Sequence, residues 1–371
     1  MNDKIKILVL HPPMYPVNYQ FYNLLGKIVD LHIWQFGEYP SDHPSWHYDE
    51  LKKLNTNINL TILGNGSDSI KNQFNIFNYT KDLKKLNPDI VLSVAFWIPS
   101  LYISLIKNIL DFKFVILTDA IEETEKGNSK IRNLIRKIIC KNTDAFIAAS
   151  SLTSDFIKTL DKNAKIYLSN QTVDITNWRE EFNKIEDKNH LKEKLSLDNS
   201  KIIMLGVGNY IHKKNWITVI NAVKKFDNLL FLLVGDGEER EKYEQLIKNE
   251  QLEKQITLVG RKSGLELKEY FKVSDFMIFP SLYDQFGFVV AEALASNLPV
   301  LCTTNAGAES LIVDGFNGFR FDINDRLEIH LEKIISNLDK LKENAYISIE
   351  NKTLENKISE FKQIFTKVLE K

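Results

Sequence analysis

Short apolar runs alternate with longer amphipathic segments along most of this chain. The runs are rich in Ile, Leu, Val and Phe, as expected of strands that are buried on both faces of a parallel sheet. In the first half of the chain, strands are predicted at residues 5–10, 30–36, 58–63, 90–95, 114–117 and 145–148. Helical patterns separate most of these strands. This order of elements is typical of a doubly wound α/β domain.

The alternation stops at the polar and charged stretch 170–200 and then resumes. The second series of strands is predicted at residues 202–207, 229–234, 256–259, 276–279 and 300–303. We therefore predict two Rossmann-like domains. Their predicted bounds are 1–175 for the N-terminal domain, 176–200 for a linker and 201–351 for the C-terminal domain. Ligands of such sheets bind beyond the carboxyl ends of the strands, so the expected site is a cleft between the domains.

Composition and charge exclude several classes of protein. The chain has 371 residues, which favours two domains over one. Its net charge of −1 excludes nucleic-acid binding through a bulk basic surface. Cys140 and Cys302 both lie in apolar patterns and suggest neither a disulfide framework nor a metal cluster, which favours a reducing compartment. No signal peptide is recognised, and Pro99 divides the longest uncharged run, 90–106, so we expect a cytoplasmic protein without a membrane span.

The most informative segment, residues 280–300, follows the predicted strand 276–279. Its loop carries Asp284, and Gly287 begins a helical pattern that carries Glu292. A glycine at such a junction lets the backbone approach a ligand, and the first free N–H groups of the helix can receive an anion. The Glu292 carboxylate is suited to accept hydrogen bonds from vicinal hydroxyls. The segment therefore predicts a nucleotide-sugar site, with phosphate at the helix start and sugar hydroxyls further along.

This segment resembles the donor-binding signature of family 4 of the retaining glycosyltransferases (glycosyltransferases group 1), which have the GT-B fold. That signature is a glutamate, seven residues and a second glutamate, with Phe-Gly just after the first. Here Asp284 takes the first position, Glu292 takes the second, and Asn297 stands where the family often has glycine. The resemblance implies two Rossmann-like domains facing each other across a cleft. It also implies that the C-terminal helix, 352–371, joins the N-terminal domain.

A second element, residues 206–215, leaves the predicted strand 202–207 and enters a helix. A Gly-x-Gly sequence followed by lysines at a helix start is suited to hold a diphosphate. In the resembled family an arginine stands here, and a lysine follows five residues later. Lys214 matches that lysine, Asn209 takes the place of the arginine, and Lys213 is a candidate to supply the missing charge. The resemblance implies that this pair neutralises the leaving nucleoside diphosphate.

The N-terminal half resembles the family in architecture more than in motifs. The family usually has Gly-Gly after the first strand, whereas this chain has His11 and two prolines. The family's His-Asp pair, which follows a central strand, corresponds to Thr118 and Asp119 here. The resemblance implies that Asp119 faces the site, but a helix or loop cap is an equally good explanation of this residue.

The resemblance assigns roles to eleven residues. The predicted catalytic residues are Lys214, Asp284 and Asp119. The predicted donor-binding residues are Asn209, Lys213, Arg261, Phe286, Gly287, Phe288, Val289 and Glu292. Arg261 is a candidate for the nucleobase wall, and a purely structural role is as well supported. No zinc, haem or nucleophile-triad pattern stands out, and the scheme requires neither a metal nor a cofactor.

The segment 126–141 is basic throughout, with six Lys or Arg residues and no Asp or Glu. Its apolar residues fall at helical spacing, so a basic amphipathic helix is predicted at 129–141. Such a helix can lie on an anionic membrane surface. The alternative is an ordinary domain helix with its apolar stripe in the core.

We expect a retaining glycosyltransferase that takes its sugar from a UDP- or GDP-sugar. Its acceptor is expected to be lipid-linked or a glycan, which places the protein in the cytoplasm or on the inner face of the membrane. Two other functions remain open. One is a GT-B sugar-nucleotide epimerase. The other is a non-catalytic, donor-binding partner subunit, which Asn209, Thr118 and the missing glycine pair would suit.

Overall fold

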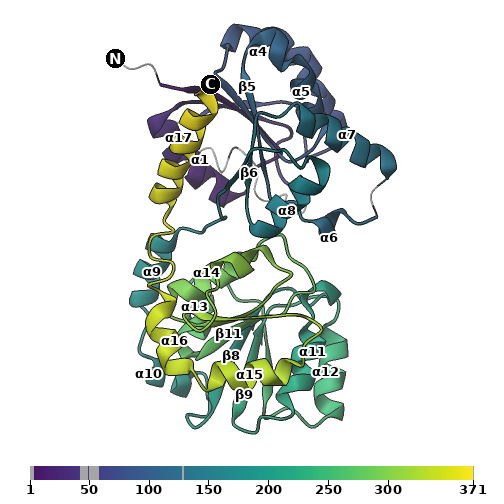
Figure 1. The fold of residues 1–371 in the computed structure, drawn as a ribbon. Helices are drawn as coiled ribbons and strands as arrows, with labels where there is room; N and C mark the ends of the chain where they lie inside the picture. The colour runs from purple at the N-terminus through teal and green to yellow at the C-terminus, as the bar shows by residue number, and fades with distance from the viewer. Residues whose placement is uncertain (1–3, 42–48, 50–57, 128, 371) are drawn as a thin grey trace. The chain divides into compact units, whose positions relative to one another are not determined.

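A computed structural model describes residues 4–41, 49, 58–127 and 129–370 of the chain. The chain divides into two compact units, each with its own parallel sheet (Figure 1). Unit 1 consists of Met1–Asn170 and Leu354–Lys371, and unit 2 consists of Gln171–Thr353.

Unit 1 has, within its described residues, a seven-stranded parallel sheet in the order β3-β2-β1-β4-β5-β6-β7. The strands are β1 (Lys6–His11), β2 (Asp30–Gln35), β3 (Asn59–Ile62), β4 (Ile90–Val94), β5 (Lys113–Thr118), β6 (Ala145–Ala148) and β7 (Ile166–Leu168). The helices are α1 (Pro16–Ile28), α3 (Ile70–Gln73), η1 (Phe74–Tyr79), α4 (Thr80–Leu86), α5 (Ile98–Leu110), α6 (Glu122–Glu125), α7 (Lys130–Lys141), α8 (Ser151–Leu160) and α17 (Leu354–Leu369). Every predicted strand of the first half is present, and β7 is an addition at the edge of the sheet.

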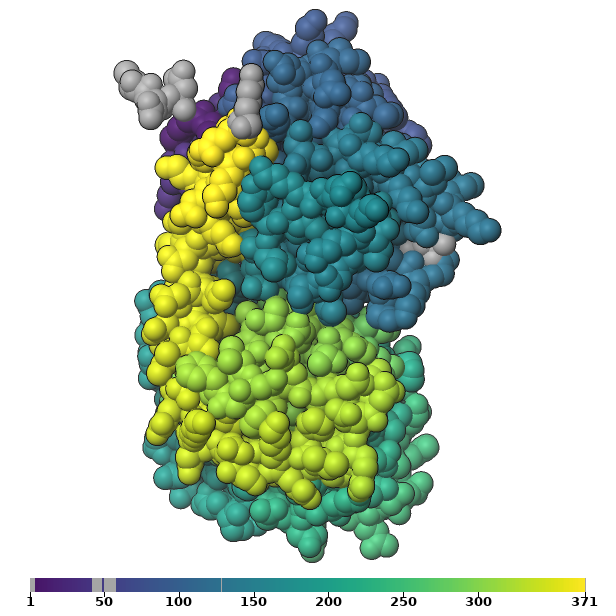
Figure 2. All heavy atoms as spheres, in the orientation of Figure 1, coloured from purple at the N-terminus to yellow at the C-terminus, as the bar shows by residue number. Residues whose placement is uncertain are grey.

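Helices cover both faces of this sheet. Successive residues of β1 point to opposite faces of the sheet, so Ile7 and Leu8 enter different core clusters. The cluster on one face includes side chains of α1 and α17, and the rings of Phe21 and Phe361 meet edge to face at 4.9 Å. Figure 2 shows the yellow atoms of α17 beside the purple atoms of the N-terminal segment. The other cluster includes η1, α4, α5, α7 and α8.

Unit 2 has a six-stranded parallel sheet in the order β10-β9-β8-β11-β12-β13. The strands are β8 (Ile202–Val207), β9 (Leu229–Val234), β10 (Ile256–Gly260), β11 (Phe276–Phe279), β12 (Val300–Thr303) and β13 (Gly318–Phe321). The helices are α9 (Ile175–Asn183), α10 (Lys188–Lys194), η2 (His212–Lys214), α11 (Trp216–Val223), α12 (Arg240–Asn249), α13 (Gly264–Val273), α14 (Phe288–Ala295), η3 (Gly307–Leu311), α15 (Leu327–Ile335) and α16 (Leu338–Ala345). All five predicted strands are present, and β13 adds an edge.

The segment 176–200, predicted as a linker, is largely helical and packs into unit 2. Ile175, Phe182 and Leu191 are buried in the core cluster of that unit. The Asp174 and Asp187 carboxylates accept hydrogen bonds from the first N–H groups of α9 and α10 and so fix where these helices begin. The few apolar residues of this polar stretch lie on the inward sides of the two helices.

Candidate functional site

The predicted donor residues lie on two loops at the carboxyl ends of β8 and β11. These strands are neighbours in the sheet, and the chain order reverses between them, which makes this the topological switch point of unit 2. The two loops are joined by hydrogen bonds. The N–H of Leu282 donates to the carbonyl of Lys213 at 2.8 Å, and the Asn215 amide donates to the carbonyl of Pro280 at 3.2 Å. The sheet therefore brings Lys214 and Asp284 together, although 70 residues separate them.

Lys214 forms an ion pair with Asp284, with the ammonium nitrogen 2.5 Å from the carboxylate oxygen Oδ2. Each side chain is only 15% exposed. The ammonium also lies 4.9 Å from the centroid of the Phe279 ring, a cation–π contact. Asn215 follows with a left-handed backbone (φ +58°), which ends η2 directly after Lys214. Asparagine tolerates this conformation better than most residues.

Gly287 begins α14 with φ +105°, a conformation that favours glycine. A Cβ at this position would stand 2.7 Å from the Phe279 ring, so glycine is also required by packing. Among the described residues, the N–H groups of Gly287, Phe288 and Val289 have no hydrogen-bond acceptor, whereas the N–H of Val290 donates to the Gly287 carbonyl. Three adjacent N–H groups at a helix start are thus available to an anion.

The two phenylalanines beside Gly287 differ in burial. Phe286 is buried, and its carbonyl accepts a hydrogen bond from the N–H of Ala308 at 2.8 Å. Phe288 is 40% exposed, and its ring meets that of Phe286 at a centroid distance of 5.7 Å. Phe286 therefore anchors the start of the helix, and Phe288 presents an aromatic surface to solvent.

Glu292 lies one and a half turns along α14, half-buried. Burial raises the pKa of its carboxyl from 4.5 to about 7, and the positive charge of Lys268 offsets part of this rise. Lys268 is itself paired with Glu181 at 2.9 Å and lies over the Trp178 ring. Within the described part of the chain, the Glu292 carboxyl has no hydrogen-bond partner, so its oxygens are available to a ligand.

Glycines 208 and 235 let the loops after β8 and β9 pack directly against each other. A Cβ at Gly235, where φ is +149°, would stand 1.9 Å from the carbonyl oxygen of Gly208. The Gly208 N–H donates to Val234 at 3.0 Å. These contacts hold the segment that leads into η2, and with it the backbone of Lys214.

The remaining predicted residues occupy more open positions. Asn209 is exposed, and its carbonyl accepts a hydrogen bond from the Trp216 ring at 3.2 Å. The ammonium of Lys213 lies 5.9 Å from the centroid of the Tyr283 ring. Arg261 is exposed and follows β10 directly. Asp119 follows β5 and belongs to unit 1, whereas the other ten residues belong to unit 2.

Asn305 was not predicted and fixes the position of Asp284. Its carbonyl accepts a hydrogen bond from the Asp284 N–H at 3.2 Å, and its side-chain amide donates to the carbonyl of Leu282 at 3.0 Å. The Gly307 N–H donates to the Asp284 carbonyl at 3.1 Å. The sequence indicates only that Asn305 closely follows a predicted strand, β12. That β12 lies beside β11 is known from the structure.

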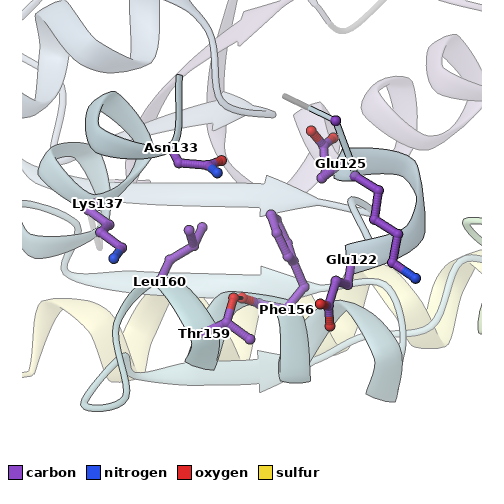
Figure 3. Close-up of a pocket in the computed structure, with 9 residues that line it drawn as sticks. Glu122, Glu125, Asn133, Lys137, Phe156, Thr159 and Leu160 are labelled. Atoms are coloured by element: carbon purple, nitrogen blue, oxygen red, sulfur yellow. Dashed lines mark hydrogen bonds between the residues drawn. The ribbon is translucent and has the colours of Figure 1, made fainter. Parts of the chain in front are cut away.

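A pocket of about 350 Å³ lies in unit 1 between α6, α7 and α8 (Figure 3). Its charged lining is balanced, with Glu122 and Glu125 against Lys126 and Lys137. A balanced lining has no net attraction for a diphosphate. Of the described residues, no group of three or more His, Cys, Asp or Glu is arranged to hold a metal ion.

Comparison with known proteins places this site in a family. Residues 187–350 match the family "Glycosyl transferases group 1". The chain is 28% identical over 165 residues to the alpha-monoglucosyldiacylglycerol synthase of Acholeplasma laidlawii, a match that covers 43% of this chain and 42% of that protein. It is 27% identical over 187 residues to the UDP-Gal:alpha-D-GlcNAc-diphosphoundecaprenol alpha-1,3-galactosyltransferase of Escherichia coli, covering 48% and 46%. The matched part of the chain thus spans less than half of either relative.

Solved structures extend the similarity to the whole fold. The chain superposes on Anabaena HepE in complex with UDP with a TM-score of 0.75, at 14% identity, covering 98% of this chain and 100% of that one. The lipopolysaccharide outer core galactosyltransferase WaaB gives a TM-score of 0.76 at 16% identity, covering 97% and 99%. Two Rossmann-like units with this connectivity define the GT-B fold, which confirms the predicted fold class. Residues 187–350 match the model of the group 1 glycosyltransferases, the family that the signature at 280–300 resembles.

Proposed function

We propose that the chain is a retaining glycosyltransferase that moves a sugar from a nucleotide-diphosphate sugar to an acceptor hydroxyl. The observation that carries this proposal is the ion pair of Lys214 and Asp284 beside the free N–H groups at the start of α14. A cation lies on the loop after β8, and three backbone donors and a carboxyl without a partner among the described residues lie at the start of α14 and further along it. Such a set suits a ligand that has both phosphates and hydroxyls.

The donor would bind along α14. Its diphosphate would accept hydrogen bonds from the N–H groups of Gly287, Phe288 and Val289, and the ribose hydroxyls would donate to Glu292. Arg261, which follows β10, and Phe288, at the start of α14, are exposed and are candidates for contact with the base and the sugar. The names of HepE structures in complex with UDP and with UDP-glucose support a uridine nucleotide as the first donor to test.

Lys214 would act on the leaving group. Negative charge develops on the diphosphate as the glycosidic bond breaks, and a fixed ammonium stabilises this charge without a metal ion. The acceptor hydroxyl would attack from the face that the diphosphate leaves, and a phosphate oxygen would take its proton. The anomeric configuration is then retained. Lys213 would supply part of the charge that Asn209 lacks, and Asp119 remains a predicted catalytic residue contributed by unit 1.

The acceptor is proposed to be lipid-linked or a glycan. Support comes from the names of the relatives, which include a glucosyldiacylglycerol synthase and a galactosyltransferase specific for a diphosphoundecaprenol-linked sugar. The first name describes a product with a lipid part, and the second describes an acceptor with a lipid part. A cytoplasmic enzyme at the inner face of the membrane would meet such acceptors.

Three measurements test the proposal. Calorimetry with UDP, GDP and ADP should show that the protein binds one of these three nucleotides much more tightly than the others. Purified protein, a labelled sugar of that nucleotide and a lipid extract should give a glycosylated product, and proton NMR of that product should show the anomeric configuration of the donor. Activity should persist with EDTA. An inverted product would contradict retention, and loss of activity with EDTA would contradict metal independence.

A non-catalytic partner subunit is a second candidate, favoured by one observation. Asn209 is exposed and uncharged at the place where the resembled family has arginine. A protein of that kind would bind the nucleotide but show no turnover with any lipid or glycan acceptor. Conversion of the sugar nucleotide without an acceptor would instead support an epimerase.

A further inference from the structure

Exposed apolar side chains of unit 1 are concentrated on three helical segments. In its described part, eight of the ten exposed large apolar side chains lie on α3 with η1, on α5 and on α7. They are Ile70, Phe74, Phe77, Leu105, Ile109, Ile131, Leu134 and Ile138. Single exposed apolar side chains are ordinary, whereas a cluster indicates an interaction site.

The three segments lie side by side in one layer. α5 packs beside α7, as Figure 1 shows, and η1 meets α5 where the rings of Phe77 and Tyr102 are 4.8 Å apart. Their inward residues, Ile76, Ile103 and Ile139, all join the same core cluster. Because the inward sides cover one face of the sheet, the outward sides form one face of unit 1. We call this outward surface of α3, η1, α5 and α7 the α5–α7 face.

α7 turns its apolar stripe towards solvent. Ile131, Leu134 and Ile138 follow at spacings of three and four residues and form one stripe. Ile131 is 71% exposed and Leu134 is 60% exposed, whereas Ile139 is buried. An ordinary domain helix would bury such a stripe. The predicted alternative, an apolar stripe in the core, holds for Ile135 and Ile139 on the inner side of α7, but not for the outer stripe.

Arg136 holds α7 in this orientation. It is the buried basic residue of the helix, and its guanidinium pairs with the Glu125 carboxylate. The guanidinium also lies 5.9 Å from the centroid of the Phe96 ring and 5.8 Å from that of Phe156. A buried charge that lost this partner would destabilise the unit, so rotating the stripe inward would be costly. The exposed stripe is thus a fixed feature of the surface.

The α5–α7 face is basic as well as apolar. The segments 70–79, 98–110 and 130–141 contain no Asp or Glu. The exposed lysines on them are Lys71, Lys130, Lys137 and Lys141. Three of these, at 130, 137 and 141, fall along one edge of the apolar stripe because seven and four residues are close to whole turns of a helix.

We propose that the α5–α7 face docks on an anionic phospholipid bilayer. The apolar side chains would enter the region between head groups and acyl chains, and the lysines beside them would contact lipid phosphates. Among the described residues, no helix combines the length and apolar character needed to cross a bilayer. Docking through this face would be peripheral and would involve side chains of three helical segments, not α7 alone.

The charge of the face favours lipid over a second copy of the chain. A two-fold symmetric contact would bring the same patch of each copy together and set lysines against lysines. Such like-charge contacts are unfavourable at an interface. An anionic bilayer matches both the positive charge and the apolar character of the α5–α7 face.

Vesicle co-sedimentation tests the proposal without any sugar donor, so its outcome is independent of the proposed glycosyl transfer. The full chain is mixed with vesicles of phosphatidylcholine alone or with phosphatidylglycerol added. Wild type should sediment only with the anionic vesicles. The triple variant Lys130→Gln, Lys137→Gln, Lys141→Gln should bind about 100-fold more weakly, since each lysine near an anionic surface contributes about fivefold. The variant Ile131→Ser, Leu134→Ser, Ile138→Ser should lose about tenfold or more.

Control variants carry the same kinds of substitution elsewhere on the surface. Lys340→Gln, Lys362→Gln, Lys367→Gln removes three exposed lysines, two of them on α17 across the sheet, and Ile329→Ser, Ile347→Ser removes two exposed isoleucines of unit 2. Controls should sediment like wild type, and thermal unfolding should show every variant folded. Failure of wild type to bind anionic vesicles overturns the proposal, as does equal loss in test and control variants. If the serine variant only abolishes a dimer seen by light scattering, the face is a contact between copies and the proposal is wrong.

Discussion

The ammonium of Lys214 and the carboxylate of Asp284 meet at 2.5 Å across the switch point of unit 2. Both groups are predicted to serve the donor, and in this structure each is the other's partner. Aspartate is one methylene shorter than the glutamate of the resembled signature, and it is held by Asn305 and Gly307. Because Lys214 is already paired, a diphosphate must compete with Asp284 for it.

The first prediction concerns the stability of this pair. Lys214→Met leaves a largely buried carboxylate without its partner and should lower the free energy of unfolding by about 2–4 kcal/mol. Adding Asp284→Asn removes the unpaired charge and should restore much of that loss. Urea unfolding of the two single variants and the double variant measures the coupling. Additive losses would show that the two side chains do not interact in solution.

The second prediction concerns competition for Lys214. Asp284→Asn should raise the affinity for the nucleoside diphosphate by about tenfold, since an ion pair of this kind contributes about 1–2 kcal/mol. Turnover of the sugar nucleotide should fall in the same variant if Asp284 is catalytic. Calorimetry and initial rates separate the two effects. Asp314→Asn, which breaks an exposed pair with Arg320, is the matched control and should change neither. Weaker nucleotide binding by Asp284→Asn would argue against competition.

The third prediction concerns the pH dependence of Glu292. Its carboxyl has a pKa of about 7 in the folded chain, above the ordinary value of 4.5. The native state therefore binds the proton more tightly than the unfolded state does, so Glu292 lowers stability as pH rises from about 4.5 to 7. Glu292→Gln should then raise the melting temperature at pH 8 and have little effect near pH 4.5. An equal shift at both pH values would contradict the raised pKa.

Glu292 should also couple nucleotide binding to proton release. If the ribose hydroxyls bind the ionised carboxylate, binding below pH 7 must displace its proton, and affinity should fall with decreasing pH. Glu292→Gln should weaken binding at pH 8 by about 1–3 kcal/mol, the range for a lost charged hydrogen bond. Calorimetry in buffers of different ionisation enthalpy counts the protons released. The variant serves as the reference for protons released by the nucleotide itself, and equal release from both proteins would rule out this role.

A fourth prediction concerns Gly287. Gly287→Ala places a Cβ against the Phe279 ring at a positive φ and should lower the free energy of unfolding by about 2–4 kcal/mol. Displacing Phe279 should also disturb its contact with Lys214 and reduce nucleotide affinity. Gly260→Ala is the control, because φ is +83° there and a Cβ meets nothing within 4 Å. Equal losses in the two variants would mean that backbone strain alone accounts for the effect.

The central strands and the switch-point loops could be predicted from sequence because their signals are local. Buried parallel strands appear as apolar runs, and the segment 280–300 holds its glycine and both carboxylates within a short distance along the chain. Two edge strands were missed, β7 because it has only three residues and β13 because it carries Arg320 at an exposed position. Helices α9 and α10 were not predicted because each buries only a few side chains within a charged stretch.

Contacts between distant segments could not be predicted in this way. Asn305 matters because β12 lies beside β11, which places its amide against the Leu282 carbonyl. The pairing of Lys214 with Asp284 depends on β8 and β11 being neighbours in the sheet. A pattern along the chain gives the strands but not their order, so these partners became visible only in the folded unit.

Helix α17 completes a core whose other parts lie far earlier in the sequence. Phe361 and Phe365 of α17 are fully buried in unit 1, whereas everything between residues 171 and 353 belongs to unit 2. On a ribosome, the sheet of unit 1 would emerge long before α17. Until α17 is made, the apolar side chains that it covers beside α1 would be exposed. During that interval unit 1 depends on chaperones or on the speed of translation. A premature stop just before residue 354 would leave unit 2 intact and expose the apolar side chains of unit 1 that α17 buries.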